Sequence, residues 1–247
     1  MKITLMAHTQ LSQEFFEHVS NIDGIYDEKD MLHEEAKLIA LTAIRTCYSP
    51  NKPSEVIVAE GDKYLKQRAT EGEGKEIDRL IRMIVKSGHT STLEHISFTF
   101  AVEGVSRALL AQLTRHRVGF GFSVQSQRYV KQSSDSKHGS FGYVVPEKVK
   151  AKEYAEKFFT SVMEDLQRAY DTLISYGVPQ EDARAVLPQA ATCNLTLSVN
   201  LRALLDFYSK RMAGNGAQHE ITVLAEKLKE EVVKVEPWIE GFFGGAK

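Results

Sequence analysis

The fold is decided by residues 95–130, which read HISFTFAVEGVSRALLAQLTRHRVGFGFSVQSQRYV. Apolar side chains alternate with smaller or polar ones over 95–103, and this period of two predicts a half-buried strand. Apolar residues then recur every four positions, which predicts a helix over about 105–116 that ends at Gly119. Alternation returns over 122–130 and predicts a second strand.

The same patterns extend in both directions along the chain. Asp30 is placed to cap one predicted helix, and Gly88 and Gly177 follow the ends of two others. Strands and helices alternate irregularly, so we predict an α+β fold in a single domain over residues 1–247. The other predicted strands cover residues 1–8 and 190–199, and the other predicted helices cover residues 30–47, 75–87, 147–176, 179–186, 200–213 and 217–234.

Residues 50–75 interrupt the helical pattern. Pro50, Pro53, Gly61 and Gly72 lie there among many charged residues. Because proline and glycine interrupt regular structure, we interpret this segment as a solvent-side surface insertion.

Composition narrows the class of protein. The chain has 247 residues, of which 43% are apolar and 26% charged, and these values are ordinary for a soluble globular protein. No apolar run reaches the roughly 18–20 residues of a membrane helix, and the N-terminus is typical of a first strand rather than a signal peptide. The two cysteines, Cys47 and Cys193, fit a reducing compartment, so we expect a cytoplasmic protein with both thiols packed.

Positive charge is concentrated in one part of the chain. Residues 104–134 contain no Asp or Glu, although the net charge of the whole chain is −2. This imbalance indicates an anion site of pocket size; the alternatives are a solvated basic face or arginines paired with distant carboxylates. The positive residues of this stretch are Arg107, Arg115, Arg117, Arg128 and Lys131, with His116 beside them.

Residue types within this stretch favour a phosphorylated planar ligand. Arg115 and Arg117 stand two apart at a predicted helix end, about 200° apart around the axis, so they can grip different groups. Ser126 and Arg128 stand two apart in a predicted strand and therefore point to the same side. A hydroxyl beside a guanidinium is suited to a phosphate.

The spacing of these residues resembles the flavin-dependent thymidylate synthases. Their signature is Arg-His-Arg, seven residues, Ser, and Arg two further on; here eight residues separate the Arg115–Arg117 triplet from Ser126. Further blocks resemble the family in the same order along the chain. They are residues 43–48, residues 89–95, the Arg184–Pro188 element, residues 200–202 and Arg211.

This resemblance implies a fold and an activity. The fold is a single domain with a central, mainly antiparallel sheet flanked by helices. The activity is reductive methylation of dUMP to dTMP, with methylenetetrahydrofolate as carbon donor and FAD, reduced by NADPH, as hydride carrier. Such enzymes are homotetramers with shared active sites, and they use no cysteine nucleophile, metal or nucleic acid.

The resemblance also assigns residues. Arg211 is the catalytic residue, because it polarises the uracil ring, and we expect it to share one cavity with Arg115 and Arg128. Asp206 stands where the family often has asparagine, and the alternative is an ion pair with Arg202. The FAD-binding set is Ser91, Arg115, His116, Arg117, Asn200, Arg202 and Asp206. The dUMP-binding set is Gln112, Arg115, Ser126, Gln127, Arg128, Arg184 and Arg211.

Two other classes of protein compete with this interpretation. A metal hydrolase is suggested by His89, Glu94 and His95, but their spacing does not match a zinc motif. We instead expect His95 to be a hydrogen-bonded core residue and Glu94 a buried partner of an arginine. A non-catalytic nucleotide- or RNA-binding protein would explain the basic stretch, yet its aromatic residues do not form the repeated pattern of a single-strand binder.

Overall fold

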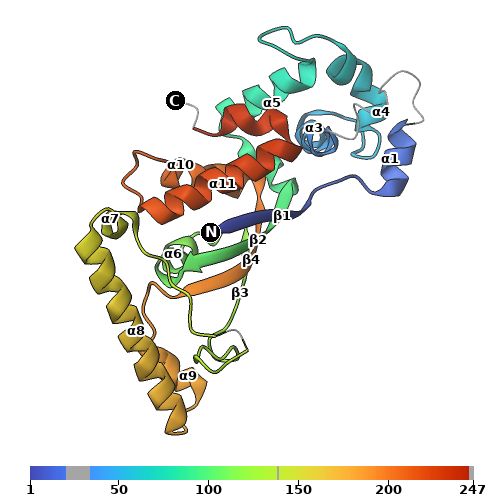
Figure 1. The fold of residues 1–247 in the computed structure, drawn as a ribbon. Coiled ribbons are helices and arrows are strands. Elements are labelled where there is room, and N and C mark those ends of the chain that lie inside the picture. Colours follow the sequence, from blue (N-terminus) through green and yellow to red (C-terminus); the bar gives the residue numbers. More distant parts are fainter. Residues whose placement is uncertain (21–33, 138, 245–247) are drawn as a thin grey trace.

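The computed structural model describes residues 1–20, 34–137 and 139–244, and its centre is a four-stranded sheet (Figure 1). The strands are ordered β1-β2-β4-β3, and every adjacent pair is antiparallel. The predicted α+β class with a mainly antiparallel sheet is therefore confirmed. The strands are β1 (Lys2–His8), β2 (Ser97–Ser106), β3 (Phe120–Val124) and β4 (Thr192–Asn200).

One face of the sheet forms the main core. Phe100 of β2 lies opposite Leu197 of β4, and Leu197 lies opposite Phe122 of β3. Phe100 and Leu197 are fully buried. The side chains between them point to the other face, where the Thr99 and Ser198 hydroxyls lie 2.9 Å apart. This alternation is what the period-two pattern predicts.

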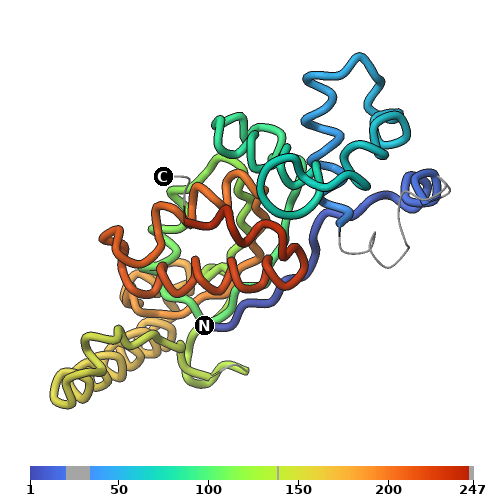
Figure 2. The backbone as a smooth tube through the Cα atoms, turned by 90° about the horizontal axis from the view of Figure 1, so that it is seen from above, coloured from blue at the N-terminus to red at the C-terminus, as the bar shows by residue number. Residues whose placement is uncertain are grey.

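Helices cover the apolar face. Figures 1 and 2 show α10 and α11, in orange and red, on one side of the sheet, and α11 contacts both β1 and α6. Asp30, which we predicted to cap the start of the helix over 30–47, lies outside the described residues. The helices are α1 (Gln13–Ser20), α3 (Glu35–Tyr48), α4 (Val56–Gly61), π-helical η1 (Asp62–Lys66), α5 (Glu76–Lys86), α6 (Arg107–Leu113), α7 (Glu147–Lys150), α8 (Glu153–Ser175), α9 (Gln180–Ala183), α10 (Leu201–Arg211) and α11 (His219–Val235), with 3-10 helices η2 (Thr90–His95), η3 (Arg184–Val186) and η4 (Pro237–Phe242).

The expectation that residues 50–75 lie on the solvent side is wrong in part. This segment contains α4 and η1, and the side chains of Val56, Ile57, Tyr64 and Leu65 are buried. Helical turns fit between the proline and glycine residues because the apolar residues there pack on neighbouring helices: α4 contacts α3, and η1 contacts α5. Its status as an insertion stays a prediction.

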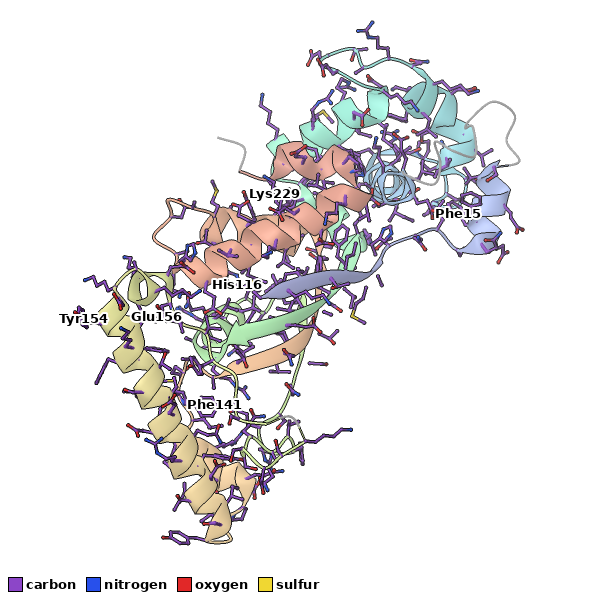
Figure 3. All side chains as sticks on the ribbon, viewed as in Figure 1. Phe15, His116, Phe141, Tyr154, Glu156 and Lys229 are labelled. Atoms are coloured by element: carbon purple, nitrogen blue, oxygen red, sulfur yellow. The ribbon has the colours of Figure 1, made fainter. Side chains whose placement is uncertain are left out.

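The predicted helix over 147–176 is divided into α7 and the long helix α8. α8 extends away from the sheet (Figure 1) and packs on a small second core of Phe141, Met163 and Ala191. Figure 3 shows Tyr154 at the end of α8 that lies next to α7, pointing away from the protein, and this side chain is 87% exposed.

Candidate active site

The Arg115–Arg117 triplet lies on a loop, and not on a helix as predicted. Helix α6 begins at Arg107 because the Ser106 hydroxyl accepts the backbone N–H of Leu109 at 3.0 Å, and it ends at Leu113. The helical separation expected for Arg115 and Arg117 therefore does not apply. Both are exposed, whereas His116 between them is half-buried.

His116 is held by the end of α10. The Nε–H of Arg211 donates to His116 Nε2 at 3.1 Å, and the Phe207 ring packs edge-on against the imidazole at 5.0 Å between centroids. Figure 3 marks His116 near the middle of the molecule. Burial lowers the pKa of His116, and the neighbouring positive charge of Arg211 lowers it further. A neutral imidazole can accept this hydrogen bond, so the pair is stable at neutral pH.

A cleft of about 540 Å³ opens beside α10, and we call it the α10 cleft. Three of the predicted FAD-binding residues, Asn200, Arg202 and Asp206, line it. Its lining combines polar and apolar residues, as is usual for the site of a large planar cofactor. Its lining is Val85, Thr90, Glu94, Val118, Gly119, Asn200, Arg202, Ala203, Leu205, Asp206, Ser209 and Phe242.

Asn200 joins the loop to this cleft. Its Oδ1 accepts the backbone N–H of Ala203 at 2.9 Å and so caps α10. Gly119 packs directly on the cap: a Cβ at this glycine would lie 2.7 Å from Asn200 Nδ2, and its φ is +73°. Only glycine fits this close approach and this backbone conformation. The loop that carries the arginine triplet is thereby fixed to the start of α10.

The charged residues that line the α10 cleft are paired. Arg202 forms an ion pair with Glu94, and Asp206 accepts Lys210 Nζ at 2.7 Å. The alternative pairing of Asp206 with Arg202 is therefore wrong. The side chains of Arg202 and Glu94 are 48% and 42% exposed, so the pair contributes little to stability and leaves the guanidinium accessible to a ligand.

A second cleft of about 790 Å³ lies between α6 and η3, and we call it the η3 cleft. It contains Gln127 and Arg184 from the predicted dUMP set. Gln127 Nε2 and Arg107 Nε are buried without a hydrogen-bond partner in the described residues. Such donors favour a ligand that accepts hydrogen bonds. The lining is Arg107, Leu110, Ala111, Thr114, Gln127, Glu181, Asp182, Arg184, Ala185, Leu187, Pro188 and Gln189.

Arg107 is a candidate site residue that our sequence analysis did not assign. The available signal was its place in the stretch without Asp or Glu. A lone arginine in the first turn of a predicted helix gave no reason to select it over its neighbours.

The predicted strand over 122–130 is wrong beyond Val124. Ser126 begins a turn: its Oγ accepts the backbone N–H of Arg128 at 3.2 Å, and its carbonyl accepts that of Val130 at 3.0 Å. The argument that Ser126 and Arg128 point to the same side therefore fails. Arg128 instead forms an ion pair with Glu181 at 2.9 Å, on the wall of the η3 cleft.

The site residues thus fall into two clefts joined by one loop. Thr114 lines the η3 cleft, and Val118 and Gly119 line the α10 cleft, so the arginine triplet spans the distance between them. Gln112 is half-buried on α6, and Ser91 is exposed on η2 beside Thr90 of the α10 cleft. Neither cleft is lined by Arg115, Arg128 or Arg211, so the expected common cavity stays a prediction for the assembled protein.

The residues that suggested a metal site have other partners. His89 Nδ1 lies 2.7 Å from the Tyr48 hydroxyl, and Glu94 pairs with Arg202. His95 and Glu94 are both exposed, so the expected burial of each is wrong. Ile96, between η2 and β2, is fully buried, whereas the His95 side chain lies outside the core. Across residues 1–20, 34–137 and 139–244, no group of three His, Cys, Asp or Glu side chains is arranged to hold a metal ion.

The two cysteines differ in their exposure to solvent. Cys47 is exposed, which corrects our expectation that it is packed, and Cys193 is buried as expected. Burial raises the pKa of the Cys193 thiol, which disfavours the reactive thiolate. Among the described helices, none has the length and apolar character needed to cross a bilayer.

Comparison with known proteins identifies relatives along most of the chain. A family model for Thy1, the thymidylate synthase complementing protein, matches residues 30–238. A flavin-dependent thymidylate synthase of Clostridium tetani is 35% identical over 215 residues, covering 81% of this chain and 78% of that protein. Another, of Geobacter sulfurreducens, is 42% identical over 164 residues, covering 66% of this chain and 68% of that protein.

Two solved structures share the fold. The flavin-dependent thymidylate synthase ThyX of Helicobacter pylori, complexed with FAD and dUMP, superposes with a TM-score of 0.64 at 22% identity and covers 98% of both chains. The UMP/dUMP methylase PolB of Streptomyces cacaoi, bound with 5-Br dUMP, gives 0.69 at 20% identity, covering 98% of this chain and 93% of that chain.

Proposed function

Because the chain belongs to the Thy1 family of flavin-dependent thymidylate synthases, we propose that it methylates dUMP to dTMP, with methylenetetrahydrofolate as carbon donor and NADPH as reductant. FAD is the proposed cofactor. The observation that carries the proposal is the Arg115–Arg117 loop, which connects two clefts of different chemical character.

The α10 cleft fits FAD. Its volume of about 540 Å³ lies in the range of cofactor pockets. Arg202 and Asn200 offer polar contacts to phosphate and ribose oxygens, and Leu205 offers an apolar surface to a ring. FAD, when bound and reduced by NADPH, supplies the hydride. We assign Ser91, Arg115, His116, Arg117, Asn200, Arg202 and Asp206 to its binding.

The η3 cleft fits dUMP. The unpaired Arg107 and Gln127 donors and the half-buried Arg184 suit a phosphate and the carbonyl edge of a pyrimidine. The Arg128 guanidinium stands next to this cleft and can exchange its exposed partner Glu181 for a phosphate oxygen. We assign Gln112, Arg115, Ser126, Gln127, Arg128, Arg184 and Arg211 to dUMP, and we add Arg107.

Arg211 is the proposed catalytic residue. Its Nε is held by His116 at 3.1 Å, and this contact orients the guanidinium. Its remaining N–H groups can donate to a uracil oxygen and favour negative charge on the ring. Greater negative charge makes C5 of uracil a better nucleophile toward the methylene carbon of the folate. His116, whose pKa is lowered, stays neutral and adds no competing positive charge.

Anaerobic turnover tests this function. The purified protein, incubated with FAD, NADPH, methylenetetrahydrofolate and dUMP, is expected to form dTMP, measured by mass-resolved chromatography. Parallel reactions with UMP establish which nucleotide is methylated, and reactions without folate are the control. FAD binding without any methylated nucleotide would contradict the proposal.

Arg184→Gln is expected to weaken dUMP binding about 10- to 100-fold, because a hydrogen bond to a charged group contributes about 1.5–3 kcal/mol. FAD affinity is expected to stay the same, because Arg184 lines the η3 cleft and does not line the α10 cleft. Isothermal titration with dUMP measures the effect. Arg168→Gln, on the exposed surface of α8, is the matched control, and equal weakening in both variants would remove Arg184 from the site.

We also propose a homotetramer with shared active sites. The exposed aromatic residues on α8 support this, because Tyr154 and Phe158 are 87% and 71% exposed in the single chain. In the part of the chain that the structure describes, neither cleft is lined by Arg115, Arg128 or Arg211, and a partner chain would complete a cavity common to them. Light scattering is expected to give four times the chain mass of 27.7 kDa, and a single-chain mass would contradict it.

A further inference from the structure

The C-terminal helix η4 is built against the α10 cleft. Its last residue, Phe242, lines this cleft and also lines a separate cavity of about 220 Å³ with Asp78 and Arg82 of α5. Phe242 therefore stands at the border of the cleft that faces α5, whereas Val118 and Gly119 stand at the border formed by the arginine loop.

Phe242 is held in this position from behind. The Trp238 ring packs edge-on against it, with 6.1 Å between centroids and 76° between planes. The indole Nε1–H of Trp238 donates to the buried carboxyl group of Glu236 at 2.6 Å. A partly buried ring that is fixed by its neighbours loses little entropy when it contacts a ligand.

The borders of the cleft point to different parts of FAD. The lining includes apolar side chains, Val85, Leu205 and Phe242, that can contact a ring, as well as the polar residues Glu94 and Arg202. The isoalloxazine ring has to lie toward the arginine loop, because that loop leads to the η3 cleft, where the nucleotide is proposed to bind. The opposite end of the dinucleotide, the adenine, is then left for the border formed by Phe242.

We propose that Phe242 is a positioning residue for FAD whose ring contacts the adenine, so that η4 forms one wall of the cofactor site. This inference rests on the proposed function, because it takes FAD as the occupant of the α10 cleft. Contact between an aromatic side chain and a base is worth roughly a 5- to 150-fold change in affinity. The partly open cleft places the expected effect near the lower end, about tenfold.

The test compares FAD with FMN, which lacks the adenine. Phe242→Ala is expected to weaken FAD binding about tenfold, measured by quenching of flavin fluorescence, and to leave FMN binding unchanged. Phe243→Ala is the matched control, because Phe243 packs against Tyr208 at 5.1 Å and does not line the cleft. If the alanine variant unfolds, Phe242→Leu takes its place, because leucine keeps an apolar side chain against Trp238. Phe242→Leu is expected to weaken FAD binding less than tenfold and to leave FMN binding unchanged.

The outcomes separate the two proposals. Unchanged FAD affinity in Phe242→Ala, or an equal loss of FAD and FMN affinity, would overturn the role of Phe242 and leave the proposed function intact. Wild-type protein that binds neither flavin would overturn both.

Discussion

Arg211→Ala lowers the rate of dTMP formation about 10²- to 10³-fold, while FAD affinity changes by less than about twofold. This decrease in rate is the size expected when an enzyme loses one fixed hydrogen-bond donor to the negative charge that develops in the transition state. FAD binding is spared because Arg211 does not line the α10 cleft. Single-turnover kinetics with saturating dUMP measure the rate, and flavin fluorescence measures the affinity.

A spectroscopic readout shows whether the contact with His116 was present. Arg211 lowers the pKa of His116, so its removal lets that pKa rise, and proton NMR of the imidazole can follow the change. Arg168→Ala is the control, because Arg168 is an exposed arginine of α8 that pairs with Asp165 and is not among the charges that lower the pKa of His116. If Arg211→Ala lost FAD affinity as strongly as it lost methyl transfer, the residue would have a general binding role instead.

Regular elements were predictable where one periodicity extended over a whole element. The alternation in 95–103 predicted β2, because one face of that strand is buried and the other is more polar, and the strand predicted over 190–199 is β4. The prediction failed over 125–130, where Ser126 and Arg128 continued the alternation by chance. The Ser126 hydroxyl accepts a hydrogen bond from the backbone N–H of Arg128, and such a turn competes with the backbone hydrogen bonds of a sheet. The periodicity of the sequence does not reveal this competition.

Site residues were predictable by type, but their grouping was not. The acid-free stretch 104–134 indicated an anion site, and it supplies Arg107 and Gln127 to the η3 cleft. The division into two clefts depends on where α6 ends and on how Gly119 packs against Asn200. These are contacts between residues far apart in sequence, about which local spacing carries no information.

Glu236→Gln is expected to stabilise the protein at pH 8. Glu236 is 2% exposed, and burial raises the pKa of its carboxyl group from 4.5 to about 7. The groups facing it are His8 of β1, whose Nδ1 lies 3.7 Å away, Trp238 of η4, and Lys37, Glu34 and Glu35 of α3. Lys37 favours the charged form and the two glutamates oppose it, but the loss of solvation is the largest cause.

The sign of the effect follows from proton binding. Below pH 4.5 the carboxyl group is protonated in both the folded and the unfolded states, so the raised pKa does not change the free energy of unfolding there. Between pH 4.5 and about 7 the folded state keeps a proton that the unfolded state releases, so the free energy of unfolding falls as the pH rises. The full loss, reached above pH 7, is about 3 kcal/mol at roughly 1.4 kcal/mol per pH unit.

Glutamine is neutral throughout this range, and its amide oxygen can still accept the Trp238 N–H. The free energy of unfolding of Glu236→Gln, minus that of wild type, is therefore expected to increase by up to about 3 kcal/mol between pH 4.5 and pH 8, measured by urea titration. Glu240→Gln, an exposed change on the same helix η4, is the control and is expected to show no such trend. Parallel curves for wild type and Glu236→Gln would mean that the Glu236 carboxyl group is ionised in the folded protein and that η4 is held by a charge rather than by a proton.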